Sequence, residues 1–158
     1  MAEFKIPQGT QQFMQDIQPE ELRYHKKRVA ITKVFTFDAA HHMHNYAGKC
    51  ISLHGHTYRL EITISGYPNE IGMSIDFGQI KKIYTEVLED KLDHRYLNET
   101  LPKMNTSVEN VIVWIWEQID AWLIDNGLKA EGFRIEELKL AETPNSWGTM
   151  KREWMEEA

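Results

Sequence analysis

The histidines and the only cysteine of this chain are concentrated in one short stretch. Five of the seven histidines and the single cysteine fall within the twenty residues from Phe37 to His56. His54 and His56 are two residues apart, and residues i and i+2 of a β-strand point to the same face. Gly55 leaves the space between them uncrowded. An extended His-Gly-His segment would therefore present two imidazoles side by side.

These two imidazoles and a third from a neighbouring strand would make a zinc site. Three histidines leave the fourth coordination position open, as in catalytic rather than structural zinc centres. The candidates for the third ligand are His41, His42 and His44. Clustered histidines on a surface strand can also be solvated and bind nothing. Cys50, four residues before His54, favours zinc because a bound cation would activate its thiol.

Composition limits the class of protein. A chain of 158 residues with 42% hydrophobic and 27% charged residues is expected to form one globular domain with a real core. One cysteine excludes an intrachain disulfide framework and suits a reducing compartment. No apolar run approaches the roughly 18 residues of a membrane span, and the polar start lacks a signal-peptide core. A cytoplasmic protein is expected. The net charge of −6 argues against a nucleic-acid partner.

Two strands are expected to carry the histidine cluster. Alternation of β-branched and aromatic residues predicts a strand from residue 29 into residue 41, and a second strand at about 53–65. Gly48 lies in a predicted loop at 45–49. His54 and His56 share the even-numbered face of the second strand with its apolar residues. Both histidines should therefore lie at the start of the inward side.

The remaining elements follow from capping and turn signals. Asp76 is expected to cap a helix running to Leu88, and Thr106 or Ser107 a second helix at 108–126 with Gly127 past its end. A loop is predicted at 92–98, strands at 135–140 and 149–154, and a turn at 144–146. The order is β-β-α-α-β-β, an α+β fold. Residues 1–27 are interpreted as an N-terminal extension and residues 28–158 as the domain.

Six short motifs occur along residues 29–150: FDAAH, C-x-x-x-HGH, IDFGQIK, LDHRYLN, the Glu-Asn pair in SVENV, and AET. In this order they resemble the 6-pyruvoyl-tetrahydropterin synthase family. The resemblance implies a tunnelling fold, in which a four-stranded antiparallel sheet carries two helices on one face and closes into a barrel by oligomerisation. Neighbouring subunits would pair the edge strands. It also implies a homohexamer with active sites between subunits.

The resemblance assigns roles to particular residues. His41, His54 and His56 would be the zinc ligands, which leaves His42 and His44 as loop residues. Cys50 would be the proton-abstracting thiolate, with Asp93 and His94 as a catalytic pair. Glu142 would anchor the pterin ring, with Thr143 beside it and Glu109 also at the substrate.

These residue types suit the implied substrate, 7,8-dihydroneopterin triphosphate. Zinc held by neutral histidines keeps its charge and can stabilise oxyanions on the substrate side chain. Cys50 could then act as a base, while Asp93 fixes the tautomer of His94 for proton transfer. Glu142 can accept two hydrogen bonds from the 2-amino-pyrimidinone edge. Taken singly, each residue also has a purely structural interpretation. Cys50 could be a buried small hydrophobic residue, Asp93 a turn residue and Glu142 a surface charge at the end of a strand.

Within the family, the resemblance implies two reactions. The position of Cys50 four residues before His54 favours the bacterial type, which releases acetaldehyde and triphosphate and leaves 6-carboxy-tetrahydropterin for queuosine biosynthesis. The alternative is elimination of triphosphate to give 6-pyruvoyl-tetrahydropterin. A zinc- and pterin-binding protein without turnover, or a structural subunit, is a further alternative. The joint presence of Cys50, Asp93 and His94 argues against it, because a binding protein needs no base and no proton shuttle.

Overall fold

Two long antiparallel strands form the centre of the sheet in the computed structural model, which describes residues 18–157. They are β1 (Val29–His41) and β2 (His54–Gly66), and their register runs without a shift from Val29 opposite Gly66 to His41 opposite His54. Next to β2 lies β4 (Arg134–Thr143), followed by β5 (Ser146–Lys151) at one edge, each antiparallel to its neighbour. The two strands predicted to carry the histidines are therefore adjacent.

A fifth strand corrects the predicted count of four antiparallel strands. β3 (Arg95–Tyr96) pairs parallel to β1 at Ala39 and Ala40, inside the segment predicted as a loop. A strand of two residues has no side-chain periodicity, so its sequence carries no signal. The pairing exists because the chain returns beside β1. The α+β class is confirmed, with the sheet order β3-β1-β2-β4-β5.

The first predicted helix begins where its cap indicated and extends past its predicted end. Asp76 and Gln79 form a capping box at the start of α2 (Phe77–Ile83). A π-helical turn (Tyr84–Leu88) and α3 (Glu89–Leu92) continue the same helical stretch. The chain then forms the short α4 (Leu97–Thr100), again within the predicted loop.

The second predicted helix is α5 (Val108–Asp125), and its ends match the sequence signals. The side chain of Ser107, rather than that of Thr106, accepts the capping hydrogen bond, from the backbone nitrogen of Asn110. Gly127 follows the helix with φ of 75°, a conformation that favours glycine.

The last predicted strand is displaced toward the N-terminus. β5 ends at Lys151, and α6 (Arg152–Met155) replaces the final residues of the strand predicted at 149–154. Arg152 is the physical reason, because its guanidinium contacts Glu136 of β4 and Glu156 one turn later, at 3.1 Å in each case. The second contact is an i,i+4 ion pair, which supports a helix.

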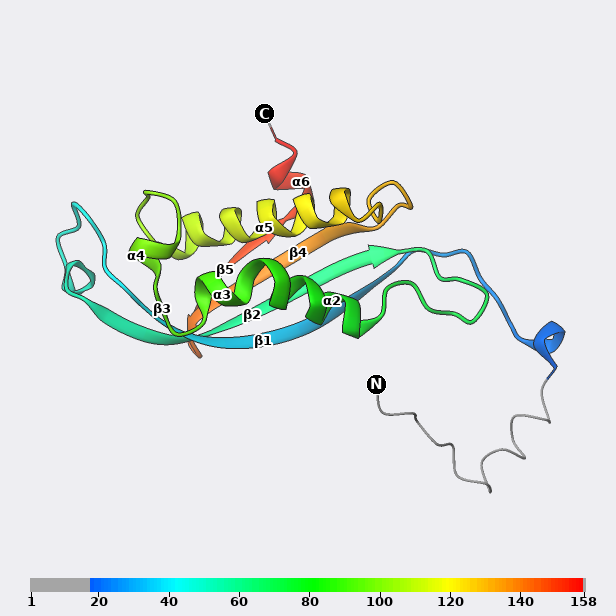
Figure 1. The fold of residues 1–158 in the computed structure, drawn as a ribbon. Coiled ribbons are helices and arrows are strands. Elements are labelled where there is room, and N and C mark those ends of the chain that lie inside the picture. Colours follow the sequence, from blue (N-terminus) through cyan, green and yellow to red (C-terminus); the bar gives the residue numbers. More distant parts are fainter. Residues whose placement is uncertain (1–17, 158) are drawn as a thin grey trace, which may run out of the picture.

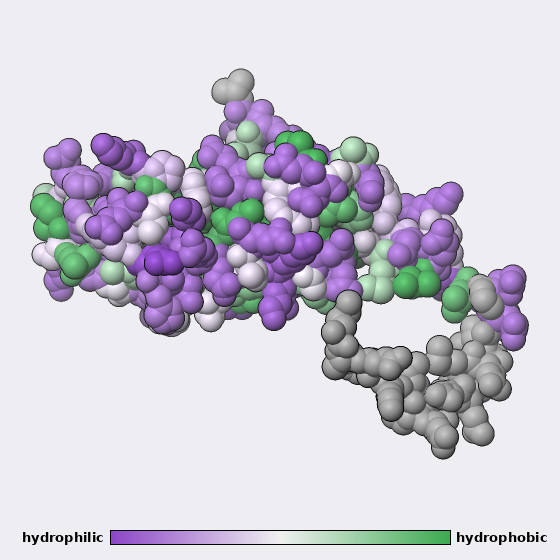
Figure 2. Space-filling model, in the orientation of Figure 1, coloured by the Kyte–Doolittle hydropathy of each residue, from purple (hydrophilic) through white to green (hydrophobic). Residues whose placement is uncertain are grey.

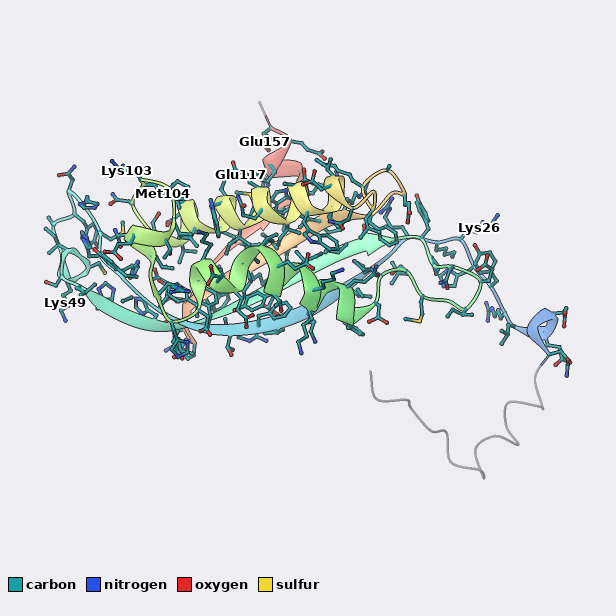
Figure 3. The ribbon with its side chains drawn as sticks, viewed as in Figure 1. Lys26, Lys49, Lys103, Met104, Glu117 and Glu157 are labelled. Carbon is teal, nitrogen blue, oxygen red and sulfur yellow. The ribbon has the colours of Figure 1, made fainter. Side chains whose placement is uncertain are left out.

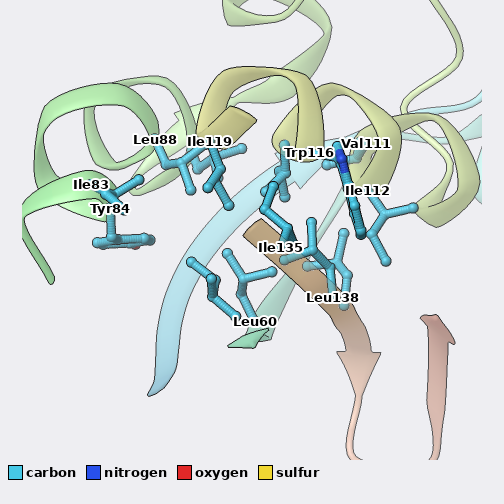
Figure 4. Packing of buried hydrophobic residues seen from close by; sticks show 14 of the residues in the cluster. Leu60, Ile83, Tyr84, Leu88, Val111, Ile112, Trp116, Ile119, Ile135 and Leu138 are labelled. Atoms are coloured by element: carbon cyan, nitrogen blue, oxygen red, sulfur yellow. The ribbon is translucent and has the colours of Figure 1, made fainter. Parts of the chain in front are cut away.

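The helices cover one face of the sheet (Figure 1). Odd-numbered residues of β1 and even-numbered residues of β2 face them, and for β2 this is the face that the alternation predicted. In Figure 4, side chains from the first helical stretch and from α5 meet Leu60, Ile135 and Leu138 of the sheet. Each fully buried aliphatic side chain of this kind contributes about 1.5–3 kcal/mol to folding. This layer holds the inner face of the sheet in place.

The surface view is mostly hydrophilic (Figure 2). Apolar side chains form several small patches, one of them at the end formed by the β1–β2 connection, where Ile51 and Leu53 are exposed. Within residues 18–157, no helix is long and apolar enough to cross a membrane. Of the N-terminal extension predicted at residues 1–27, residues 1–17 lie outside the part of the chain that the structure describes.

Candidate metal centre

Three histidines converge where β1 ends and β2 begins. His41 is the last residue of β1 and lies directly opposite His54, the first residue of β2, with His56 two positions further along. The Nε2 atoms of His41 and His54 are 3.1 Å apart. One ligand atom from each of the three rings lies within 4.8 Å of the others. The register of the hairpin, which the sequence left open, thus brings His41 rather than His42 or His44 to the pair.

Two of the rings are oriented by backbone carbonyls. Nδ1 of His41 lies 2.8 Å from the carbonyl oxygen of Thr106, and Nδ1 of His54 lies 2.7 Å from that of Ser52. A ring whose Nδ1–H donates to a carbonyl keeps its lone pair on Nε2. Nε2 of His56 is buried and has no hydrogen-bond partner among residues 18–157. A metal ion would satisfy all three nitrogens.

The electrostatics of the site also fit a metal. Burial lowers the pKa of His41 and that of His56 below the ordinary histidine value, although the charge of Glu142 opposes the shift. Both rings are therefore neutral near pH 7, the form that binds a cation. Three neutral imidazoles are a donor set typical of zinc. The residues present fit the group that the sequence predicted.

Two asparagines hold the chain just beyond the first ligand. The side chain of Asn98 accepts a hydrogen bond from the backbone nitrogen of His42 and donates one to its carbonyl, each at 3.0 Å. Asn105 does the same at His44, at 2.7 and 3.0 Å. Each side-chain amide thus pairs with the backbone N–H and C=O groups of one residue, as a neighbouring β-strand would. Sequence reasoning missed this function, for which the position of Asn98 in LDHRYLN was the only signal.

Cys50 lies beside the same site, on a 3₁₀ turn (Lys49–Ile51) of the β1–β2 connection. Figure 3 shows Lys49 at the tip of this connection. The backbone nitrogen of Met43 donates to the carbonyl of Cys50 at 2.8 Å, which ties the turn to the end of β1. A cavity of about 370 Å³ joins these parts, and its lining includes His41, Tyr46, Cys50, Glu109 and Glu142.

Glu142 faces the histidines, whereas Thr143 does not. The two carboxylate oxygens of Glu142 lie 3.9 Å from Nε2 of His41 and 4.0 Å from Nε2 of His56. Thr143 is the next residue of β4 and lines a different cavity, together with Thr57 on the far side of the sheet. The alternation of a strand separates these two predicted substrate contacts.

Asp93 and His94 form a linked pair away from the three histidines. Oδ1 of Asp93 lies 3.0 Å from Nδ1 of His94 and accepts a hydrogen bond from the backbone nitrogen of Asp38 at 3.1 Å. Burial raises the pKa of Asp93, but these hydrogen bonds outweigh it, so the pKa lies below the ordinary value. His94 adopts a positive φ of 55° and lines a shallow depression with Asp38 and Thr57 of the outer face. His56 borders the same depression, but the three histidines form a cluster separate from Asp38, Asp93 and His94. Within one chain, the structure does not bring this pair to the metal centre.

The fold and site thus define an α+β protein with a three-histidine centre beside a cavity that holds a cysteine and two glutamates. A sequence model described as 6-pyruvoyl tetrahydropterin synthase matches residues 30–153. The chain belongs to this family, as the resemblance predicted.

Relatives and solved structures agree with the assignment. A Haemophilus influenzae protein named 6-carboxy-5,6,7,8-tetrahydropterin synthase is 37% identical, over 74% of this chain and 94% of its own length. A Dictyostelium discoideum protein named 6-pyruvoyl tetrahydrobiopterin synthase is 32% identical, over 77% of this chain and 94% of its own. The structure of Caenorhabditis elegans 6-pyruvoyl tetrahydropterin synthase superposes with a TM-score of 0.68 at 25% identity, covering 82% of this chain and 99% of that one.

Proposed function

We propose that this protein is a cytoplasmic, zinc-dependent lyase of queuosine biosynthesis. It converts 7,8-dihydroneopterin triphosphate and one water molecule into 6-carboxy-5,6,7,8-tetrahydropterin, acetaldehyde and triphosphate. The observation that carries the proposal is the cavity in which His41, one of the three clustered histidines, meets Cys50 and Glu142. The name of the Haemophilus influenzae relative supports the same reaction.

The three histidines would hold the zinc through their Nε2 atoms, with the tautomers of His41 and His54 set by the carbonyls behind them. Bound zinc would supply a Lewis acid that stabilises negative charge on the side-chain oxygens of the substrate. Cys50, on its anchored turn, removes a proton from the substrate side chain as a thiolate. The turn fixes the base at the edge of the cavity, where the side chain of the substrate must lie.

Glu142 recognises the pterin in this proposal. An ionised carboxylate accepts two hydrogen bonds from the amino and ring N–H groups of the pyrimidinone edge, and such a paired contact is directional. Glu109 lines the same cavity from the first turn of α5 and contacts the substrate beside it. The cavity is polar at these two carboxylates.

Asp93 and His94 enter the mechanism from a neighbouring subunit. They lie by the outer face of the sheet, so within one chain they cannot shuttle a proton to the substrate beside Cys50. Thr143 shares that outer face. The sheet edges at β3 and β5 are available for pairing with other copies, and paired edges avoid unsatisfied backbone groups. A homohexamer with sites between subunits would bring Asp93 and His94 to a neighbour's Cys50 and would pair the sheet edges. The pterin triphosphate is the proposed ligand, and no nucleic-acid or membrane partner is proposed.

The deciding experiment is product analysis. The zinc-loaded protein is incubated with 7,8-dihydroneopterin triphosphate and the products are weighed by mass spectrometry, with the Cys50→Ala variant as control. A 6-carboxy-tetrahydropterin product with acetaldehyde supports the proposal. A 6-pyruvoyl product would instead place the protein with its Dictyostelium discoideum relative, whose name gives that activity. Binding without any product would leave a zinc- and pterin-binding protein.

A further inference from the structure

The hydroxyl group of Tyr58 is a buried donor without an acceptor. Tyr58 is 1% exposed, and its hydroxyl oxygen has no hydrogen-bond partner among residues 18–157. A buried polar group left unpaired costs free energy, and such groups are rare in folded proteins. Phenylalanine would fill the same space without that cost. The hydroxyl therefore calls for a function outside the folding of the free chain.

The strand register places this hydroxyl beside the proposed pterin anchor. Arg59 of β2 lies opposite Ala141 of β4, so in the same antiparallel register Tyr58 faces Glu142 across the two strands. Both residues occupy the inner, even-numbered positions of their strands. Cross-strand neighbours on one face of a sheet are close enough for their side chains to interact.

The ring of Tyr58 is held rigidly next to the metal centre. It stacks on Phe37 with ring centroids 4.9 Å apart and an interplanar angle of 7°. It also meets the rings of His41 and His56 edge-on, with centroids 6.1 and 5.6 Å away. These contacts restrict the direction of the hydroxyl, which suits a group that must orient another.

We propose that Tyr58 is a positioning residue, whose hydroxyl donates a hydrogen bond to the carboxylate of Glu142 when the site holds its metal and a pterin. This inference rests on the proposed function. In the free chain the Glu142 oxygens face His41 and His56 at 3.9 and 4.0 Å, beyond hydrogen-bond distance. Once a cation occupies those nitrogens, the carboxylate needs a donor that keeps it directed at the pterin.

The test compares pterin affinity and thermal stability in the Tyr58→Phe variant. The probe is 7,8-dihydroneopterin, bound to the zinc-loaded protein. We expect its dissociation constant to rise about tenfold or more, the usual effect of losing a hydrogen bond to a charged group. Without pterin, we expect an unchanged or higher melting temperature and unchanged zinc content, because the removed hydroxyl has no partner. Weaker pterin binding together with an unchanged or higher melting temperature indicates that Tyr58 positions Glu142. A packing function would instead lower the melting temperature of the pterin-free protein.

Two further variants show whether Tyr58 acts through Glu142. In a Glu142→Ala background, which has no side-chain oxygen to accept the hydrogen bond, Tyr58→Phe should change the dissociation constant by less than about twofold, because the two residues act through one contact. The matched control is Tyr84→Phe. Tyr84 is also buried and stacks on a phenylalanine of β1, Phe35, at 4.3 Å. We expect this control to bind 7,8-dihydroneopterin as the wild type does.

The remaining outcomes contradict either the proposed function or the positioning function of Tyr58. If the wild-type protein does not bind 7,8-dihydroneopterin, the proposed function and this inference fail together. If the wild type binds and Tyr58→Phe binds equally well, only the inference fails. Loss of zinc in Tyr58→Phe, or an equal loss of affinity in both backgrounds, would also overturn it, since Tyr58 would then act on the fold or independently of Glu142.

Discussion

Nδ1 of His41 lies 2.8 Å from the carbonyl oxygen of Thr106, a residue 65 positions away in the chain. This contact ties the end of β1 to the segment just before α5. It sets the tautomer of a ring that is 2% exposed and directs its Nε2 atom toward His54 and His56. An oriented, neutral imidazole is a stronger metal ligand than a freely rotating one.

The first prediction concerns the metal. Purified protein should contain about one zinc ion per chain, and His54→Ala should lose most of it, since two imidazoles seldom hold zinc alone. Inductively coupled plasma mass spectrometry measures the content. His44→Ala is the matched control, because His44 comes from the same cluster and its backbone, not its ring, is bound by Asn105. Full zinc retention in His54→Ala would remove the proposed centre.

The second prediction separates the base from the pterin anchor. If Cys50 acts in the transition state, Cys50→Ala should lower kcat by about 10²-fold or more, with KM and zinc content nearly unchanged. Glu142 binds in the ground and transition states alike, so Glu142→Ala should mainly raise KM. The lost contact corresponds to roughly 2–4 kcal/mol, since a hydrogen bond to a charged group is worth about 1.5–3 kcal/mol.

Steady-state kinetics and zinc analysis of both variants check this division. A Cys50→Ala enzyme with near-normal kcat would leave His94 as the only base among the residues assigned here. Zinc loss in Cys50→Ala would identify the cysteine as a ligand, contrary to the three-histidine site.

The third prediction follows from the separation of His94 from the three histidines. Oligomers made only of Cys50→Ala chains or only of His94→Ala chains should be inactive. Oligomers co-assembled from both at equal amounts should recover about a quarter of wild-type activity, because by chance that share of intersubunit sites combines two intact halves. Sites contained within one chain would recover nothing.

Light scattering provides the companion measurement for that experiment. The protein is expected to run as a hexamer at micromolar concentration. A monomer would contradict the shared site and leave the outer-face location of Asp93 and His94 without a function in catalysis.

The fourth prediction concerns the dependence of stability on pH. Partial burial raises the pKa of Glu136, but hydrogen bonds from Ser65, Arg134 and Arg152 more than reverse this and lower it to about 2, from 4.5 in a free chain. A depressed carboxyl pKa stabilises the fold above pH 4.5, and that contribution is lost as the pH falls toward 2.

Glu136→Gln should therefore lower the free energy of unfolding by roughly 2 kcal/mol at pH 7 and flatten its decline in acid. Urea denaturation at several pH values measures both effects. Glu137→Gln is the control, because that side chain has only a 3.7 Å ion pair with Lys139, worth about 0.5 kcal/mol. Equal effects of the two variants would contradict the assignment.

Local patterns in the sequence were sufficient for part of this protein. Alternation placed His54 and His56 on the inward face of β2. Short capping signals located the start of α2 at Asp76 and the start of α5 to within one residue, at Thr106 or Ser107. These features depend on residues within a few positions of one another. Strand geometry and helix capping act over that same range, so a single sequence reveals them.

Long-range pairing decided the rest. The register of the hairpin chose His41 over His42 and His44, and the return of the chain beside β1 created β3 and put His94 by the outer face. The position of Tyr58 opposite Glu142 depends on the pairing of β2 with β4, in which the neighbouring pair Arg59 and Ala141 is 82 positions apart in the chain. Such contacts form only when the whole sheet is assembled, because no local spacing records which strands will meet.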